Sequence, residues 1–345
     1  MSETKRVLPV DDEGTTTSAA QVVVQQRRSR LGNIRWDILW ERYGIAAILL
    51  VIWLLSYFLV PDFSNIDNFT EILRQSSFVG IAAVGMMIVI LLGSFDLSVG
   101  STLALCAWLT VTIAGQHQLL WAFVATLLLG CFIGAINGAL VAFMRIPAFI
   151  VTLSMLFIIS GYTYVITGGN SALYVGQEFT QIGGGDLLGI PIPFIVFVLC
   201  ALLGAALLRY TAFGRYVYAA GSNAVAARIA GVPVRRTQFY SFVLVGLFTA
   251  GAAILLASRL YTAGPGLEPD FELNAIATVV LGGTRLSGGR GSMLGTFAAA
   301  LLFTTISNIL DLLSMDAFVQ RVIVGLVLLV ALSIEGIRAR LAERT

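Results

Sequence analysis

The chain has 345 residues, of which 58% are hydrophobic and only 12% are charged. Soluble domains average about 45–50% apolar and about 25% charged residues, so a soluble chain this apolar has too few polar side chains to cover its surface. The composition therefore predicts a protein embedded in lipid. The net charge of +2 is too small to indicate a nucleic-acid partner.

The first 43 residues are polar and are predicted to form a cytoplasmic, largely disordered tail that ends in an interfacial segment. They are too long and too poorly organised for a cleaved signal peptide, and the apolar stretch behind them is a full membrane span. Trp36, Trp40 and Tyr43 are typical of aromatic residues at a membrane surface.

The rest of the chain alternates between long apolar stretches and short polar turns. About 20 mostly apolar residues are needed to cross a membrane as a helix. We predict an all-α integral membrane protein with about ten transmembrane helices, some of them broken or short. The predicted spans are 44–60, 69–93, 97–115, 119–143, 148–167, 190–209, 238–260, 271–283, 292–313 and 317–335. Segment 271–283 is short, and is alternatively a half-helix or a re-entrant segment.

The distribution of basic residues tests this map. With ten alternating spans and the N-terminus inside, 18 of the 21 Lys and Arg residues fall on the cytoplasmic side. The exceptions are Arg74, Arg259 and Arg321. Cytoplasmic loops of membrane proteins carry an excess of Lys and Arg, so the map is favoured, with both termini cytoplasmic. We predict a transmembrane domain at 44–337 and a cytoplasmic C-terminal tail at 338–345.

Catalytic and metal sites are excluded by the residues that such sites need. Lys5 is the only lysine, which excludes a phosphate-binding P-loop. His117 is the only histidine, which excludes a zinc-protease helix and a credible Ser-His-Asp triad. Cys106, Cys131 and Cys200 lack the CxxC spacing, so they are predicted to be free apolar residues. We predict no enzyme activity, no metal and no cofactor on this chain.

The cytoplasmic loop 210–237 is the most informative segment. Ser222 or Asn223 is suited to cap a helix, and residues 224–230 are mostly good helix formers. Gly231 is suited to the left-handed conformation that ends a helix, and Pro233 prevents its continuation. A helix of about two turns is therefore predicted between spans 6 and 7. It is either a solvated linker or a docking element for a cytoplasmic partner.

This loop resembles the ATPase-coupling loop of the permease subunits of bacterial ABC sugar importers, of the ribose, xylose and arabinose type. The matching residues are Thr211, Phe213, Gly214, Arg215, Tyr218, Ala219, Gly221, Asn223, Ala226, Ala227, Arg228, Gly231 and Val232. The family often has acidic residues where this chain has Ala224 and Val225. The resemblance implies that ATPase coupling rests on Phe213, Gly214, Arg215, Gly221, Asn223, Ala227, Arg228 and Gly231.

Three further stretches resemble the same family, in the same order along the chain. They are 92–101, 146–155 and 272–292, and the resemblance covers about residues 66–335. Ser94 stands in place of the second glycine of the family's pattern, and Arg285 departs from its usual small residue. Four matching stretches in the right order make chance similarity improbable.

The resemblance implies a transmembrane channel subunit in the bacterial inner membrane that moves a monosaccharide inward by alternating access, a sugar like ribose, xylose, arabinose or galactose. The implied partners are a cytoplasmic ABC ATPase that binds ATP and Mg, an external solute-binding protein, a second permease chain and membrane lipid. Two alternatives stay open: the same architecture used for branched-chain amino acids, or a secondary transporter driven by an ion gradient.

Two glycine-rich turns share a sequence pattern, which suggests an internal repeat. The candidate gate or hinge residues in them are Gly93, Asp96, Gly100, Gly282, Gly283, Arg285 and Gly289. These turns are either packing corners or parts of a gate. Asp96 and Arg285 are predicted to occupy matching positions, and either to pair with each other or to contact the ATPase side.

Small and polar residues mark two other spans. Gly130, Gly134 and Gly138 are predicted to form a close-packing face on span 119–143. Asn137 beside them either lines a solute path or bonds a neighbouring helix. Asn308 and Asp311 are three residues apart and are predicted to share a helix face, as pathway-lining or interface residues.

Overall fold

The protein is described by a computed structural model at residues 36–116, 118–174, 176–316, 318–323, 325, 326 and 329. Residues 42–345 pack as one unit, distinct from residues 1–41. The predicted N-terminal tail up to residue 35 and the predicted C-terminal tail lie outside the described residues.

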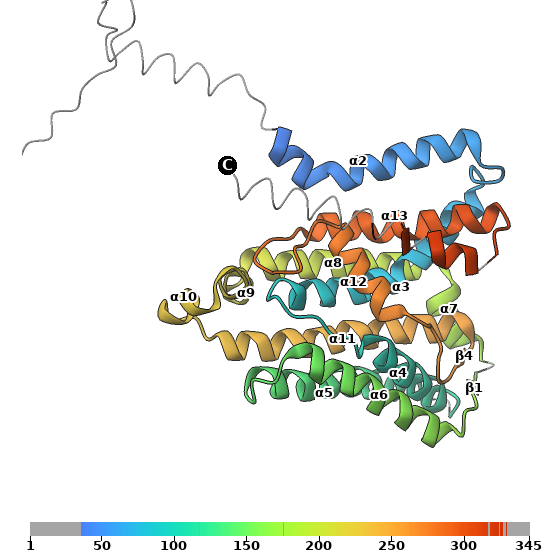
Figure 1. Cartoon of the computed structure of the whole chain (residues 1–345). Coiled ribbons are helices and arrows are strands. Elements are labelled where there is room, and N and C mark those ends of the chain that lie inside the picture. The colour runs from blue at the N-terminus through green and yellow to red at the C-terminus, as the bar shows by residue number, and fades with distance from the viewer. Residues whose placement is uncertain are drawn as a thin grey trace, which may run out of the picture. The chain divides into compact units, whose positions relative to one another are not determined.

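Helices make up most of the described chain, and a few two-residue strands join them (Figure 1). The helices are α2 (Trp36–Leu59), α3 (Ile66–Ile90), α4 (Val99–Ala114), α5 (Leu119–Ala142), α6 (Ala148–Thr167), α7 (Gln177–Gly184), α8 (Ile192–Tyr210), α9 (Ala212–Ser222), α10 (Ala224–Ile229), α11 (Val234–Leu260), α12 (Phe271–Leu281) and α13 (Met293–Leu312). The strands are β1 (Ala172–Leu173), β2 (Asp186–Leu187), β3 (Ile190–Pro191) and β4 (Thr262–Ala263). Residues 318–323 are helical as well.

Each of the first nine predicted spans coincides with a helix within about four residues at the ends, except that α2 begins eight residues before the predicted span 44–60. Within the described residues, α3, α5, α6, α8, α11 and α13 are long and apolar enough to cross a membrane, judged by length and composition. The apolar part of α2, together with α4 and α12, is shorter. The prediction of a helical protein with several membrane spans is confirmed. The number ten stays a prediction, since the last predicted span, 317–335, is only partly described.

The core is built around α3 and α11. From Phe78 to Leu91 nearly every side chain of α3 is buried, and α8, α11, α12 and α13 all pack against it. Helix α11 also packs along α5, where a Cβ atom on Gly130, Gly134 or Gly138 would collide with the α11 backbone. The predicted close-packing face of α5 is therefore confirmed, because only glycine lets these two backbones approach so closely.

The two ends of the bundle differ in structure (Figure 1). One end, which we name the α10 end, carries α9, α10 and the turns at 91–98, 143–147 and 282–292. The other, the β4 end, carries α7 and two small antiparallel ladders, β1 with β4 and β2 with β3. The segment 168–189, predicted as a loop, thus contains a helix, which is fixed to α11 by a hydrogen bond from the Gly183 N–H to Ser258 Oγ at 2.7 Å.

Candidate functional site

The predicted helix in the loop 210–237 is present as α10. Asn223 caps it: its Oδ1 accepts hydrogen bonds from the N–H groups of Val225 at 3.0 Å and Ala226 at 2.9 Å. Gly231 ends it with φ +83°. The Val232 N–H then reaches back to the Ala227 carbonyl at 3.0 Å, the bonding pattern of a glycine-terminated helix.

The residues just before α10 also form a helix, α9, which was not predicted from the sequence. Thr211 caps it, accepting a hydrogen bond from the Gly214 N–H at 3.2 Å. Gly214 is buried, and a Cβ atom there would collide with the Leu208 carbonyl. The exposed Arg215 donates from Nη1 to the Thr211 carbonyl oxygen at 3.2 Å. Phe213 is half-buried and packs against the core, so α9 is held onto the end of α8.

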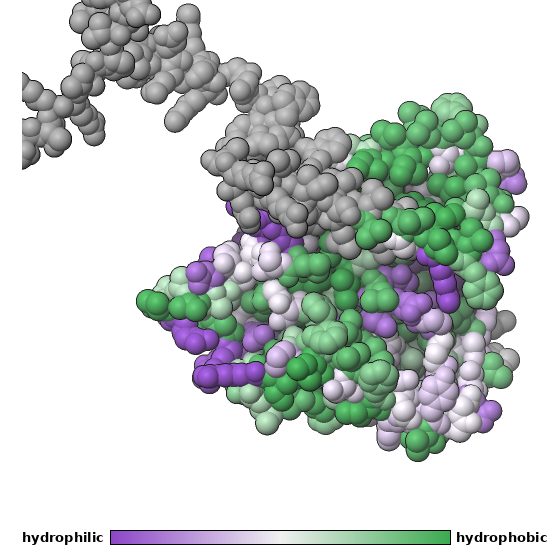
Figure 2. Space-filling view, viewed as in Figure 1, coloured by the Kyte–Doolittle hydropathy of each residue, from purple (hydrophilic) through white to green (hydrophobic). Residues whose placement is uncertain are grey.

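Helix α10 presents apolar side chains to solvent. Val225 is 69% exposed and Ile229 is 84% exposed, and four residues apart they lie on one helix face. Arg228 is exposed beside them, whereas Ala227 is buried against the protein. In Figure 2 the α10 tip shows hydrophobic surface beside strongly hydrophilic surface. Exposed aliphatic pairs on a short helix outside the bundle are typical of a partner-binding face.

The C-terminal end of α9 touches both glycine-rich turns, at a contact that we name the glycine junction: Leu91, Gly93, Gly221, Gly288 and Gly289. The Gly289 N–H donates to the Leu91 carbonyl at 2.9 Å. A Cβ atom on Gly221 would collide with that same carbonyl oxygen, and one on Gly288 would lie 2.8 Å from it. Three segments distant in sequence therefore meet through backbone atoms, with no room for side chains.

Tyr218 adds a second link between α9 and the second turn. Its hydroxyl donates to the Gly291 carbonyl at 3.4 Å. Burial raises the pKa of Tyr218 above its ordinary value, so the hydroxyl keeps the proton that this bond needs.

The two turns begin alike but in a different register from the one predicted. Gly93 has φ +71° and Gly283 has φ +83°. In each turn a backbone N–H group donates to the carbonyl oxygen five residues earlier: Ser94 to Val89 at 3.2 Å, and Thr284 to Val279 at 3.2 Å. This pairs Gly93 with Gly283 rather than with Gly282. Asp96 and Arg285 therefore do not occupy matching positions, which corrects the prediction.

Asp96 is buried in a hydrogen-bond network and does not pair with Arg285. Its Oδ1 accepts from the Ser98 N–H at 2.8 Å and the Ser98 hydroxyl at 2.6 Å. Its Oδ2 accepts from Asn137 Nδ2 at 3.1 Å. Within the described residues, the ion pairs are Arg74–Asp186 and Arg259–Glu71. The predicted Asp96–Arg285 pair is absent, because the Asp96 carboxylate accepts its hydrogen bonds from Asn137 of α5 and from Ser98, which precedes α4.

Two other candidate hinge glycines lie at helix crossings. Gly100, in the first turn of α4, lies so close to Glu272 of α12 that a Cβ atom would collide with the carboxylate. Gly282 lies against the backbone of Gly295 and Thr296 in α13. These glycines let the short helices α4 and α12 approach their neighbours.

The three predicted pathway residues are not brought together. Asn137 of α5 is fully buried against the α3–α4 turn, and its Oδ1 has no hydrogen-bond partner. Asn308 is buried and exchanges two hydrogen bonds with Asn68 of α3, at 3.1 Å and 2.7 Å. Asp311 is exposed and accepts from Gln320 Nε2 at 2.8 Å.

Comparison with known proteins agrees with this architecture. Residues 68–332 match the family model described as the permease component of a branched-chain amino acid transport system. The chain belongs to this permease family. It is 38% identical over 306 residues to the ribose import permease protein RbsC of Escherichia coli (strain K12), covering 86% of this chain and 94% of that protein.

Other relatives extend the pattern. The RbsC protein of Bacillus subtilis (strain 168) is 38% identical over 315 residues, covering 90% of this chain and 98% of the relative. The L-arabinose transport system permease protein AraH of Escherichia coli (strain K12) is 36% identical over 308 residues, covering 89% and 94%. No solved structure matches. Membership in the family identifies this chain as a multi-pass membrane protein that is the membrane subunit of a transporter.

Proposed function

We propose that this chain is the channel subunit of a binding-protein-dependent ABC importer that moves a monosaccharide inward. A separate cytoplasmic ATPase supplies the energy, and the sugar class follows from the ribose and arabinose permeases among the relatives. In this proposal the chain itself carries no catalytic residue.

One observation carries the coupling role of α10: its exposed Val225 and Ile229, which no part of the described chain covers. A face of this kind is stabilised when a partner removes it from water, by about 1.5–3 kcal/mol for one fully buried aliphatic side chain. We propose that the ATPase provides that cover. The coupling residues in this proposal are Phe213, Gly214, Arg215, Gly221, Asn223, Ala227, Arg228 and Gly231.

The glycine junction is the proposed route from α10 into the membrane. A displacement of α9 moves the backbone of Gly221, and the tight contacts with Leu91 and Gly289 transmit that movement to both turns. The proposed gate or hinge residues are Gly93, Asp96, Gly100, Gly282, Gly283, Arg285 and Gly289. They lie where α3 meets α4 and where α12 meets α13, so a shift there repositions two pairs of helices.

The remaining parts of the proposal follow the charge map. The α10 end and both termini face the cytoplasm of a bacterial cell, and the protein has ten spans in its inner membrane. The solute-binding protein docks on the β4 end, and a second permease chain completes the channel. We propose that Asp311 meets the solute, while the amides of Asn137 and Asn308 hold helices together beside the path.

Branched-chain amino acids are the second candidate substrate, because the description of the matching family names them. The sugar is favoured because the named relatives that we compared are ribose and arabinose permeases.

Reconstitution tests the proposal. The chain is incorporated into vesicles with and without its ATPase and binding protein, and uptake of labelled ribose, arabinose and leucine is measured. We expect sugar uptake that needs ATP and both partners. Uptake driven by an ion gradient without the ATPase would reject an ABC importer, and leucine uptake without sugar uptake would replace the substrate.

A further inference from the structure

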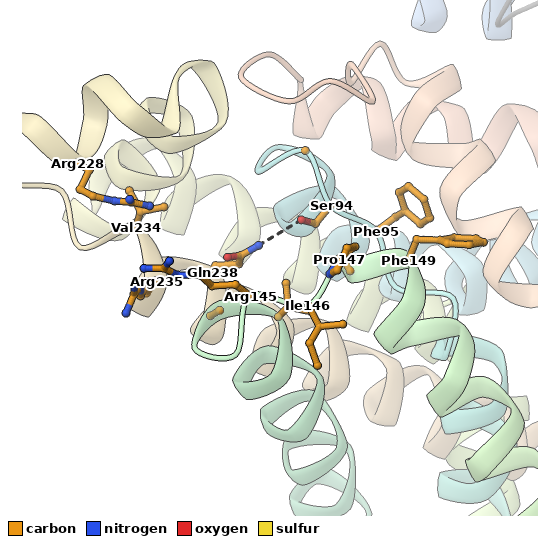
Figure 3. A pocket seen from close by; sticks show the side chains of 14 residues that line it. Ser94, Phe95, Arg145, Ile146, Pro147, Phe149, Arg228, Val234, Arg235 and Gln238 are labelled. Atoms are coloured by element: carbon orange, nitrogen blue, oxygen red, sulfur yellow. Dashed lines mark hydrogen bonds between the residues drawn. The ribbon is translucent and has the colours of Figure 1, made fainter.

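A pocket of about 490 Å³ opens at the α10 end, beside the glycine junction, with which it shares Gly93. It lies between the α5–α6 turn, the α3–α4 turn and the start of α11 (Figure 3). Its polar lining is basic: Arg145, Arg228 and Arg235, together with Gln238. Gln238 is positioned by a hydrogen bond from Nε2 to Ser94 Oγ at 3.4 Å, drawn as the dashed line in Figure 3.

The three guanidinium groups have no acidic partner. Within the described residues, none of Arg145, Arg228 and Arg235 forms an ion pair. Three like charges around one cavity repel each other, and an anion in the cavity relieves that repulsion. Arg145 also has a left-handed backbone, φ +61°, which is uncommon for a residue with a side chain. Such local strain clusters at ligand sites.

The pocket lies at the edge of a strongly apolar surface. Helices α5 and α6 are among the membrane-spanning helices least buried within this chain, so much of their apolar surface is free to contact lipid. Phe143 and Met144 follow the last turn of α5, and Phe149 and Ile150 stand in the first turn of α6; all four are exposed. Figure 3 shows Phe95 and Phe149 on the side of the pocket opposite Arg228 and Arg235. Charge on one side and apolar surface on the other match an amphiphilic ligand.

We propose that this pocket binds the phosphate headgroup of an anionic phospholipid, with the acyl chains lying along the start of α6. Guanidinium groups bind phosphate oxygens through paired N–H donors. Basic pockets between helices at the cytoplasmic membrane surface are typical sites for acidic lipid headgroups. An acidic segment of the ATPase is the competing occupant. Arg228, a proposed coupling residue, lines the pocket, but the ATPase is less favoured as its occupant because Val225 and Ile229, the exposed face of α10, do not line it.

The proposal is tested on the full-length purified chain by native mass spectrometry, with phosphatidylglycerol, phosphatidylcholine and inorganic phosphate as separate probes. We expect preferential retention of phosphatidylglycerol. The double variant Arg145→Gln, Arg235→Gln is expected to bind it roughly 25-fold more weakly, since each basic residue near an anionic lipid surface contributes roughly fivefold. Neither residue belongs to the proposed coupling set.

The matched control is Arg290→Gln, an exposed arginine at the same end but outside the pocket, which should leave lipid retention unchanged. The double variant Arg145→Lys, Arg235→Lys should retain most of the binding, which separates charge from misfolding. Equal retention of both lipids, or binding of inorganic phosphate as tight as that of phosphatidylglycerol, would overturn the proposal. Full lipid binding by the glutamine variant with loss of ATPase binding would assign the arginines to the partner instead. The assay needs neither ATPase nor sugar, so its outcome is independent of the transport function.

Discussion

The β4 end and the α10 end of the bundle differ in whether their charged groups form ion pairs within the described chain. At the β4 end, Arg74 pairs with Asp186 and Arg259 pairs with Glu71, while short strands pair their backbone groups. At the α10 end, none of the described arginines forms an ion pair within the described chain. They are Arg145, Arg209, Arg215, Arg228, Arg235, Arg236, Arg285 and Arg290.

This difference shows which end of the bundle pairs its charged groups within the described chain and which end leaves them unpaired. At the β4 end, two ion pairs and two strand ladders supply partners from within the chain. The α10 end leaves cations and two aliphatic side chains to be covered by something else, and at the same time carries the tightest backbone contacts between distant segments. A region that receives a partner and transmits its movement needs both properties. The predictions below test this contrast, beginning with the largest expected effect.

Gly221→Ala should disrupt the close backbone contact between α9 and Leu91. The added Cβ atom would overlap the Leu91 carbonyl oxygen, so one backbone must move. We expect ATP-dependent uptake to fall at least tenfold, with a stability loss of about 1–3 kcal/mol typical of overpacking. Uptake in vesicles and thermal unfolding of the purified protein measure the two effects.

Gly251→Ala is the matched control for that variant. Gly251 lies inside α11, and no heavy atom is within 4 Å of the place of its Cβ. Alanine favours a helix interior over glycine by about 0.8–1.0 kcal/mol. The protein should therefore be as stable as before or more so, with full uptake. Equal loss of uptake in both variants would remove the special role of the glycine junction.

Ile229→Asp should weaken ATPase binding by about tenfold or more, as expected when a charge enters an apolar contact. Because Ile229 is 84% exposed, the fold of the free chain should be unaffected. Ile229→Leu should bind normally. Pull-down or surface-binding measurements with the ATPase give the result, and unchanged affinity of the aspartate variant would show that α10 is a solvated linker.

The ion pair Arg259–Glu71 should show measurable coupling at the β4 end. Both side chains are partly buried, 25% and 29% exposed. A double-mutant cycle with Arg259→Gln and Glu71→Gln should give a coupling energy of about 1 kcal/mol in the free energy of unfolding. The variant Arg290→Gln at the α10 end should change stability by less than about 0.5 kcal/mol. If the two ends respond alike, the contrast between them does not hold.

Asp96 and Arg285 should show no coupling. They share no hydrogen bond and no partner, so the stability losses of Asp96→Ala and Arg285→Ala should add within about 0.5 kcal/mol. Asp96→Ala should account for most of the loss, since it removes the acceptor of three buried hydrogen bonds, from the Ser98 N–H, the Ser98 hydroxyl and Asn137 Nδ2. A double variant milder than Asp96→Ala alone would restore the ion pair that the sequence pattern suggests.

Local signals in the sequence were enough to predict α10 and the close-packing face of α5. Asn223 and Gly231 mark the ends of α10 through short-range hydrogen bonds, and Gly130, Gly134 and Gly138 recur at helical spacing. The exposed face of α10 was missed, although Val225 and Ile229 stand four residues apart in a segment already predicted to be helical.

Features that depend on contacts between distant residues were not predictable in this way. Helix α9 was missed because Gly214 and Gly221 are poor helix formers. Glycine is required at these two positions by close contacts with the backbone of Leu208 and Leu91, which the sequence does not reveal. One partner of Asp96, Asn137, is 41 residues away on another helix. The predicted register of the two turns was wrong by one residue. Sequence similarity aligns Gly93 with Gly282, whereas the left-handed backbone conformation aligns Gly93 with Gly283.

The glycine contacts between α5 and α11 have a mechanical consequence. Where Gly130 and Gly134 meet the α11 backbone, no side chain separates the two helices, so we expect a shift of one to be passed directly to the other. The two helices therefore behave as one rigid body, with α10 attached to its end through Pro233. Any push on α10 reaches both at once, so labels on facing positions of α5 and α11 should keep a constant separation throughout the transport cycle.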